Sequence, residues 1–405
     1  MAEVLTVKKL GPLKEARIEP RPLTVIIGPQ ASGKSLIAQC LYFFRGLRQH
    51  VARRYKSSWQ DDPYWYNTAL KEVLDDIRGV AFGYFAEGTA SIAYHDSDDR
   101  QAIGLKVYGS NRRVSANQAL KNRMTKWIGD WKGDVRTIEK AWLKSPNLYI
   151  PTERSIFTRL VEEKTGMLFD LVHPEPFRAF AQELFQAQNI YRTFFQRKPG
   201  FELSENIRDA NRYILTCQQL ALSGEAYVPP YGRQEWKWRV SEPQAAGDGS
   251  QKGRVVPIQA TASGQTEAWP FFVIAATYGI LYNGGRFYFE EPETHLHPAA
   301  QIQVANVIAF LVNRGQQFTI TTHSPFFLYI INNFVMRYLV NGEKFLNNMV
   351  GLDPNDVAVY SLKDGACRDI MDREDTKLIP ETELDQVANQ LGAEFDQLLD
   401  QLDRD

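Results

Sequence analysis

The chain has 405 residues and a net charge of −1, with 44% apolar and 23% charged residues. This composition is typical of a globular protein and excludes wholesale disorder. The balanced charge excludes a polycation that coats nucleic acid in bulk. Three scattered cysteines, Cys40, Cys217 and Cys367, are too few for a disulfide framework or a zinc ribbon. With no signal-peptide pattern and no apolar run of ~20 residues, the sequence predicts a cytoplasmic protein that does not enter a membrane.

The charges are unevenly distributed along the chain. Residues 352–405 carry a net charge of −10, so the preceding residues carry about +9. The stretch 112–144 alone holds nine Lys or Arg residues and three tryptophans, Trp127, Trp131 and Trp142. It can bind nucleic acid through phosphate charge and base stacking. Alternatively, it is a solvated helix face whose tryptophans lie in the core, or the acidic tail of one copy docks on the basic body of another.

Apolar periodicity predicts alternating strands and helices along the chain. The expected strands are 4–10, 14–19, 23–27, 80–95, 103–108, 147–150, 254–259, 286–289, 317–321, 357–362 and 367–371. The expected helices are 36–47, 65–77, 116–142, 176–195, 204–222, one that ends near 282, 299–312 and 383–402. Residues 242–253 are rich in glycine and polar residues and predict a flexible loop. The pattern is that of an α/β protein with a mixed sheet.

The strongest motif is a phosphate-binding loop that follows the apolar strand 23–27 and opens a helix. It consists of Gly28, Pro29, Gln30, Ala31, Ser32, Gly33, Lys34 and Ser35. Its glycines let backbone N–H groups wrap a phosphate, and the helix N-terminus adds a positive dipole end. Lys34 can reach the β- and γ-phosphates and Ser35 can ligate Mg²⁺. The sequence therefore predicts that ATP and Mg²⁺ are bound here.

A second motif places two carboxylates at the end of the strand 286–289. Glu290 and Glu291 would lie at the carboxyl edge of the sheet, where ligands bind in α/β proteins. One carboxylate, Glu290, can hold the Mg²⁺ shell, and the other, Glu291, can orient the attacking water. The usual first acid of this motif is Asp, and the extra methylene of Glu290 still allows contact with the metal through a bound water.

The segment EEPETHLHP, followed by TTHSP, resembles the ABC-type ATPase heads of the RecF, SMC and OLD class. It is most similar to the small ATPases of the bacterial anti-phage systems Septu, PARIS and OLD. The resemblance implies a P-loop fold of the ABC-head type with Glu291 as general base. It further implies that His323 senses the γ-phosphate and that His297 contacts a second protomer.

The same resemblance identifies a signature motif in residues 261–267. Ser263, Gly264 and Gln265 would close over the nucleotide of a partner subunit, which implies at least a homodimer with head-to-tail sites. The phrase YIPTERS at 149–155 resembles a strand and loop of the same group. Gln60 is a candidate for the Q-loop glutamine by position alone. His295 and His297 do not make a zinc site, because no other His or Cys group completes one.

The predicted organisation is an ATPase head that is interrupted by an insertion. Residues 1–60 would carry Walker A, 61–254 a globular helical and β insertion, 255–345 the signature, Walker B, D-loop and switch histidine, and 346–405 an acidic strand pair and helix. Only about 80 residues follow the switch histidine and none form D-x-D, so a built-in Toprim nuclease is not expected. The absence of heptads between the phosphate loop and the signature argues against a long coiled-coil arm.

The sequence therefore predicts an ATP-hydrolysing sensor or scaffold subunit of a bacterial anti-phage system. A separately encoded effector, a nuclease or a toxin, would be its partner. The alternative is a RecF-like ATPase of DNA repair or DNA-structure binding, for which the basic stretch 112–144 would contact phosphates. A transporter subunit is less compatible, because such subunits usually carry a clear LSGGQ. The intact Lys34, Glu291 and His323 argue against a binding module with a dead ATP site.

Overall fold

The computed structural model of the chain describes residues 2–54, 68, 86, 88–96, 101–109, 113–130, 146–154, 175–195, 203–227, 236–240, 254–346, 348–384, 393 and 395. Several predicted features lie outside these residues. They include Gln60, Trp131, Trp142 and the whole of the loop expected at 242–253. Of the helix expected at 65–77, only Thr68 is described. Of the helix expected at 383–402, only residues 383, 384, 393 and 395 are described.

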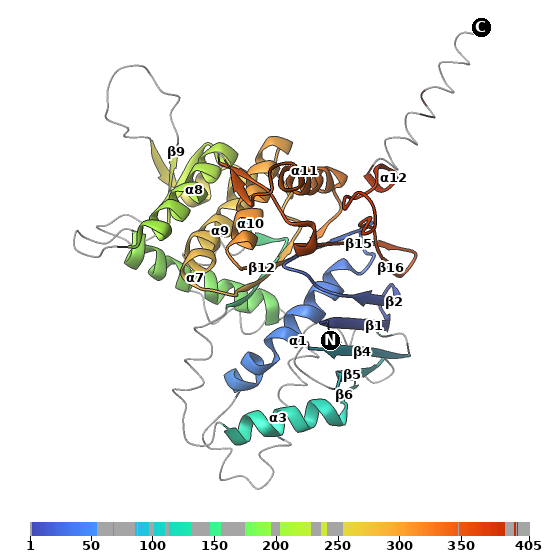
Figure 1. Cartoon of the computed structure of the whole chain (residues 1–405). Coiled ribbons are helices and arrows are strands. Elements are labelled where there is room, and N and C mark those ends of the chain that lie inside the picture. Colours follow the sequence, from blue (N-terminus) through green and yellow to red (C-terminus); the bar gives the residue numbers. More distant parts are fainter. Residues whose placement is uncertain are drawn as a thin grey trace, which may run out of the picture.

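In the described part of the chain, eleven strands form one mixed sheet in the order β6-β5-β4-β1-β2-β16-β15-β3-β12-β11-β7 (Figure 1). Five neighbouring strands run parallel, and we call them the parallel half. These strands are β15 (Val357–Lys363), β3 (Leu23–Ile27), β12 (Gln317–Thr322), β11 (Arg286–Glu290) and β7 (Asn147–Ile150). Their registers bring the ends of β3, β12 and β11 level, since Ile27 pairs with Thr322 and Thr321 pairs with Glu290.

The other end of the sheet is an antiparallel wing. Its strands are β2 (Leu13–Ile18), β1 (Val4–Leu10), β4 (Thr89–His95), β5 (Ile103–Tyr108) and β6 (Arg113–Ala116). The strand β16 (Ala366–Asp369) joins the wing to β15, because it runs antiparallel to β15 and parallel to β2. The wing is therefore continuous with the parallel half, although β4, β5 and β6 are far from β15 in the sequence.

Alternating side chains of the strands feed two hydrophobic cores, one on each face of the sheet. In β11, Phe287 and Phe289 belong to the first core, whereas Tyr288 belongs to the second. The second core lies between one face of the sheet and two helices, α1 (Lys34–Arg54) and α3 (Gln118–Asp130). This face includes side chains of the wing strands. Both helices lie on the same side of the sheet in Figure 1.

The first core is covered by a group of helices on the opposite face (Figure 1). They are α7 (Glu175–Phe195), α8 (Glu205–Leu222), α9 (Ser263–Ile274), α10 (Pro298–Asn313), α11 (Pro325–Asn341) and the short α12 (Glu381–Leu384). A π-helical turn, Ala275–Gly279, continues α9. Smaller strands complete this side, namely β8 (Gly224–Tyr227), β9 (Lys237–Val240), β10 (Val255–Pro257), β13 (Phe345–Leu346) and β14 (Met349–Val350).

The structure differs from the sequence prediction at several elements. Helix α3 begins at Gln118 and not at 116, because Ala116 still pairs in β6 and the Asn117 side chain accepts the N–H of Leu120. The strand expected over 254–259 ends at Pro257, and a 3₁₀ turn, Ile258–Ala260, follows. No helix is predicted from the sequence after the TTHSP segment, where the structure has α11. Its Pro325 at the first helical position is compatible with a helix start.

The described part of the basic stretch, residues 113–130, contains β6 and the amphipathic helix α3. Leu120, Met124 and Ile128 of α3 are buried, and Trp127 packs against the second core. For Trp127, the structure therefore supports the core interpretation. Lys126 is exposed on the opposite face.

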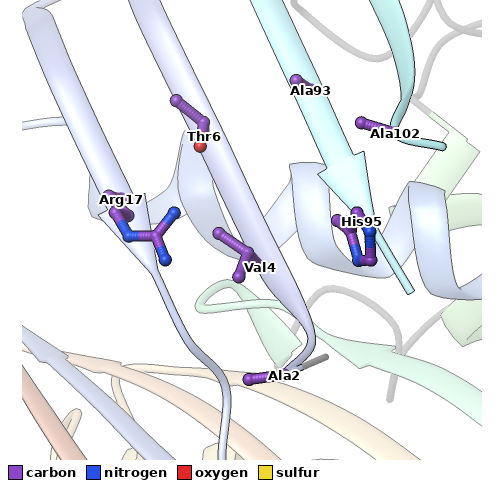
Figure 2. A pocket seen from close by; sticks show the side chains of 7 residues that line it. All are labelled: Ala2, Val4, Thr6, Arg17, Ala93, His95 and Ala102. Atoms are coloured by element: carbon purple, nitrogen blue, oxygen red, sulfur yellow. The ribbon is translucent and has the colours of Figure 1, made fainter. Parts of the chain in front are cut away.

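A surface pocket of about 390 Å³ lies on the open face of the wing, away from α1 and α3 (Figure 2). Thr6 of β1, Arg17 of β2 and His95 of β4 contribute to its lining. It contains none of the motif residues singled out in the sequence. Among the described helices, none is long and apolar enough to cross a membrane.

Candidate nucleotide site

The loop between β3 and α1 is shaped by two positions that tolerate no ordinary side chain. Gly33 has φ +100°, and a Cβ there would lie 2.8 Å from the side chain of Leu13. A Cβ on Gly28 would lie 2.6 Å from the carbonyl oxygen of Leu362 in β15. Ala31, between them, has φ +58°, which is uncommon for a residue with a Cβ. Close packing against β2 and β15 thus requires the loop to form a tight turn at the N-terminus of α1.

Lys34 folds back over this turn. Its side chain donates to the carbonyl oxygens of Gly28 at 2.8 Å and Pro29 at 2.7 Å, and the residue is 6% exposed. Burial lowers the pKa of Lys34, and the nearby carboxylates Glu291, Glu293 and Glu290 oppose that shift. The ammonium group therefore lies over the loop and near three carboxylates, which is where a cation is needed beside bound phosphates.

Polar atoms in the loop suit an anionic ligand. The Ser32 hydroxyl is buried and has no hydrogen-bond partner among the described residues. A hydroxyl in that position can donate a hydrogen bond to a phosphate oxygen, which would supply the partner that it lacks. Together with the glycines and Lys34, it fits a nucleotide phosphate. Ser35, the second residue of α1, is the candidate hydroxyl ligand for Mg²⁺.

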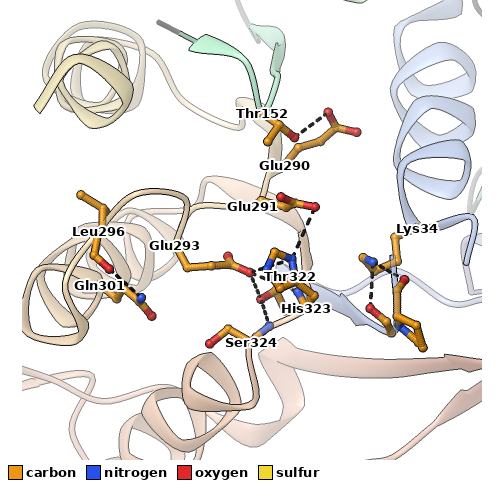
Figure 3. Close-up of polar contacts among 12 residues, drawn as sticks. Lys34, Thr152, Glu290, Glu291, Glu293, Leu296, Gln301, Thr322, His323 and Ser324 are labelled. Atoms are coloured by element: carbon orange, nitrogen blue, oxygen red, sulfur yellow. Dashed lines mark hydrogen bonds and ion pairs between the residues drawn. The ribbon is translucent and has the colours of Figure 1, made fainter. Parts of the chain in front are cut away.

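Glu290 ends β11 and is 4% exposed. The hydroxyl of Tyr149 in the adjacent strand β7 donates to its Oε1 at 2.6 Å, and Thr152 donates to its Oε2 at 3.4 Å. Burial, followed by the charge of Glu290, raises the pKa of Tyr149 well above its usual value, so the phenol remains a donor. The Glu290 side chain points toward Thr152 in Figure 3. The longer acid thus lies against β7.

Glu291 lies one residue beyond β11 with φ +43°, a strained conformation for a residue with a Cβ. Its N–H donates to the carbonyl oxygen of Thr321 at 2.8 Å, which fixes it to the end of β12. Its carboxylate lies 3.5 Å from Nδ1 of His323, which follows β12 (Figure 3). The parallel pairing of β11 with β12 therefore brings these two predicted site residues together.

Glu293 completes the surroundings of His323. Its Oε1 accepts from the hydroxyl of Thr322 at 2.6 Å and from the backbone N–H of His323 at 3.1 Å (Figure 3). The same carboxylate oxygen lies 3.7 Å from Nδ1 of His323, so the imidazole lies near two carboxylates. The Oε2 atom of Glu293 is buried without a hydrogen-bond partner among the described residues.

The predicted signature residues lie at the start of α9. Ser263 is exposed, whereas the Gln265 side chain accepts the N–H of Ala262 at 3.0 Å and donates to the carbonyl oxygen of Leu222 at 2.6 Å. Gln265 thus holds the turn that precedes the helix. A Cβ on Gly264 would lie 2.5 Å from the carbonyl oxygen of His295, so the signature turn packs against the predicted D-loop.

His297 caps α10. Its Nδ1 accepts the N–H of Ala299 at 3.3 Å and the residue is exposed. His295 has φ +59°, so this turn is also strained. Within the described residues, no group of three or more His, Cys, Asp or Glu side chains could hold a metal ion.

Sequence reasoning assigned no role to Tyr149, Glu293 or Arg154. Tyr149 lies in β7, Arg154 lies four residues after β7, and Glu293 lies two residues after Glu291. Each contacts residues at the candidate site. The signal that could have found Tyr149 and Arg154 is the phrase YIPTERS. It begins in a buried strand and continues into polar residues at the carboxyl edge of the sheet.

Comparison with known proteins gives one match to a protein family. Residues 251–328 match the model of a family described as an AAA ATPase domain. No curated protein matches the chain.

Several solved structures are similar to the chain at low identity. The SMC head bound to the C-winged helix domain of ScpA has 16% identity and a TM-score of 0.48, over 91% of this chain and 96% of that chain. The SMC head domain from Thermotoga maritima has 10% identity and a TM-score of 0.39, over 91% of this chain and 98% of that chain.

The match to an AAA ATPase domain over residues 251–328 includes the carboxylates at the end of β11 and His323 after β12. It is consistent with the ATPase motifs of the chain, which has a mixed α/β fold with one large mixed sheet in its described part.

Proposed function

We propose that this chain hydrolyses ATP with Mg²⁺ at the edge where β3, β11 and β12 end. The observation that carries the proposal is the convergence of Lys34, Glu291 and His323 at that edge through the parallel strand pairing. Mg²⁺ supplies charge neutralisation at the phosphates. Lys34 holds the β- and γ-phosphates, and Ser35 and Glu290 belong to the metal shell.

Glu291 is the proposed general base. It is the least buried of the three carboxylates near Lys34 that the site gathers, with 25% of its side chain exposed, so it can reach a water molecule. His323, 3.5 Å away, would sense the γ-phosphate and stay aligned through the backbone contact with Glu293. The backbone of residues 28–33, from Gly28 through Pro29, Gln30, Ala31 and Ser32 to Gly33, would wrap the phosphates.

The proposal includes composite sites between two copies. Ser263 and Gly264 of one subunit would close over the nucleotide of another, with Gln265 holding the signature turn and His297 facing the partner. The exposure of Ser263 and His297 is compatible with an interface of this kind. The signature turn packs on the D-loop of its own chain, and the proposal that it serves a second copy rests on the sequence resemblance.

The biological role rests on the sequence resemblance. We infer a sensor or scaffold subunit of a bacterial anti-phage system, in which nucleotide-driven closure holds or releases a separately encoded effector, a nuclease or a toxin. The protein should co-purify with a partner from its native operon, and its deletion should increase phage sensitivity. Absence of both effects would contradict this role and leave the ATPase activity as a separate question.

The decisive first experiment is ATP turnover by the purified protein, with Glu291→Gln as the test variant. Loss of a general base lowers turnover by about 10²–10⁴-fold. Glu343→Gln, at an exposed glutamate outside the site, is the matched control and should retain wild-type turnover. Nucleotide affinity, measured with a fluorescent ATP analogue, should change little in either variant. Wild-type turnover by Glu291→Gln would contradict the assignment of the base.

Adding linear duplex DNA to the same assay separates the two biological interpretations. Turnover that is indifferent to DNA favours a protein-triggered sensor. Stimulation by DNA favours the RecF-like alternative, and the stimulation should then weaken with salt and on neutralisation of Lys121, Arg123 and Lys126 in α3.

A further inference from the structure

Arg154 is a buried arginine beside the carboxylates at the end of β11. It lies four residues after β7 and is 1% exposed. Its guanidinium lies over the ring of Phe289, 4.9 Å from the centroid. A fully buried cation is costly unless it is paired and hydrogen-bonded. The identity of its partners therefore indicates what the side chain is there to hold.

The partners of Arg154 belong to two separate elements. Nη1 donates to the carbonyl oxygen of Glu290 at 2.8 Å and Nη2 to that of Glu291 at 3.3 Å. Nε donates to the carbonyl oxygen of Glu267 in α9 at 2.9 Å and lies 3.9 Å from its carboxylate. A further bond from Nη1 to Pro151, at 2.8 Å, fixes the side chain to its own loop.

The planar guanidinium suits this task better than an ammonium group would. It offers five donors in a fixed fork, and here the fork is shared between the end of β11 and the first turns of α9. Burial lowers the pKa of Arg154 to about 10, against the opposing effect of Glu267 and the carboxylates at residues 290, 291 and 293. The side chain is therefore still a cation at neutral pH.

We propose that Arg154 is a positioning residue that ties α9 to the backbone of Glu290 and Glu291. It couples the location of the signature turn to the orientation of the base. The proposal rests on the proposed function, in which Glu291 serves the nucleotide of its own subunit and Ser263 and Gly264 serve that of the partner. A movement of α9 when a partner nucleotide binds would then reach Glu291 through one rigid side chain.

The backbone of Glu291 gives this link its importance. At φ +43° the residue is strained, and such a conformation persists only where its surroundings over-determine it. The N–H of Glu291 donates to Thr321, and its carbonyl oxygen accepts from Arg154 at 3.3 Å and from the N–H of Thr294 at 3.1 Å. Loss of the Arg154 contact would leave the carbonyl oxygen with the local turn contact alone, so the peptide would relax and displace the carboxylate from His323.

The test compares Arg154→Lys with a matched buried arginine elsewhere. Arg45 in α1 is also buried and pairs with the carboxylate of Glu3 at 2.5 and 2.8 Å. Its other contacts with β11 lie at the start and middle of the strand, with Arg286 and Tyr288. Within the described residues it makes no hydrogen bond to Glu290, Glu291 or α9. Arg45→Lys is therefore the control for the loss of a buried guanidinium. Thermal unfolding of both variants identifies the temperature range in which each is fully folded.

Within that range, Arg154→Lys should lower kcat at least 10-fold while changing ATP affinity by less than about 3-fold. Arg45→Lys should leave kcat within about 2-fold of the wild type. Glu267→Gln, which keeps the carbonyl acceptor and removes the charge, should give an intermediate loss. Equal retention of kcat by Arg154→Lys and Arg45→Lys would overturn the proposal, as would an Arg154→Lys defect confined to ATP affinity.

A second measurement does not depend on turnover. Amide hydrogen exchange of the wild type should show that ATP protects the first turns of α9 and residues 290–294 together. In Arg154→Lys, protection of α9 should no longer extend to residues 290–294. Joint protection in the variant would overturn the proposal. If the wild type binds ATP without hydrolysing it, the proposed function fails while this exchange experiment still tests Arg154.

Discussion

The parallel half of the sheet and its antiparallel wing differ in where their strands end. In the parallel half, β3, β12 and β11 finish at one edge, and the phosphate loop, His323 and Glu291 all follow those ends. In the wing, neighbouring strands run in opposite directions, so each edge carries alternating strand starts and strand ends. Strand direction therefore concentrates the polar motif residues at one place, which the wing cannot do.

Both regions contain a buried tyrosine that donates to a carboxylate. In the parallel half, Tyr149 donates to Glu290 at 2.6 Å. In the wing, Tyr94 donates to Glu3 at 2.8 Å, and Arg45 neutralises that carboxylate. Similar chemistry thus has different surroundings, because the first pair lies at the candidate site and the second fastens α1 to the edge of β1 and β4. The comparison predicts functional effects in the first region and stability effects alone in the second.

The largest expected difference concerns two glycines with positive φ. Gly33→Val should lower ATP affinity by at least ~100-fold, about 2.7 kcal/mol, because its Cβ would clash with Leu13 and distort the loop. Gly88→Ala in the wing has φ +88° but no atom within 4 Å of the new Cβ. It should cost some stability and leave affinity unchanged. Binding of a fluorescent ATP analogue checks both variants, and equal affinities would remove the distinction between the regions.

A smaller difference is expected for the two tyrosines. Tyr149→Phe should lower turnover about 10-fold, because Glu290 would keep only the 3.4 Å contact with Thr152 and would lose its fixed orientation. Tyr94→Phe should leave turnover unchanged, since Arg45 still holds Glu3. Each substitution should reduce the free energy of unfolding by about 1 kcal/mol. Urea unfolding and steady-state turnover measure the two effects separately, and a turnover defect in Tyr94→Phe would break the comparison.

The smallest effect is a dependence of stability on pH in the wing. Burial raises the pKa of Glu3, but its hydrogen bond to Arg45 and the Arg45 charge outweigh burial, so the pKa is lowered. A carboxyl group with a lower pKa in the folded state adds stability that is fully present above its unfolded pKa of about 4.3 and is lost as pH falls through its folded pKa. The free energy of unfolding should therefore decrease below about pH 5.

Glu3→Gln tests this assignment, because it removes the titrating group and should flatten that part of the pH profile. The exposed Glu343→Gln is the control and should keep the wild-type slope. Denaturant unfolding at several pH values between 3 and 7 gives the slopes. An unchanged slope in Glu3→Gln would show that another group causes the acid sensitivity.

Several strands of the sheet, in the wing as well as in the parallel half, could be predicted from local patterns. The strands 4–10, 23–27, 103–108 and 147–150 have the predicted bounds, because short apolar or alternating runs between turn residues specify strands strongly. Helix α1 continues to Arg54, seven residues beyond the expected end, because Val51 and Ala52 extend its buried face. The helix α11 was missed, although Ser324, Pro325 and the apolar residues that follow are compatible with it.

The motif residues of the candidate site could be predicted from the sequence, but the residues that hold them in position could not. The residues to which we assign the chemistry, Lys34, Glu291 and His323, lie in recognisable local patterns. Tyr149 and Arg154 support them from a strand more than 130 residues away from Glu290 in sequence. No local pattern specifies that contact, because it depends on β7 pairing with β11.

The loop at residues 28–35, the carboxylates after β11 and the histidine after β12 can be recognised without a structure, because each consists of particular residue types at a short, fixed spacing. The contact of Glu290 with Tyr149, and the link that Arg154 makes between α9 and the Glu291 backbone, arise from the folded arrangement. The physical reason is that strand order and register arise from packing of two cores on one sheet, which joins residues from distant parts of the chain.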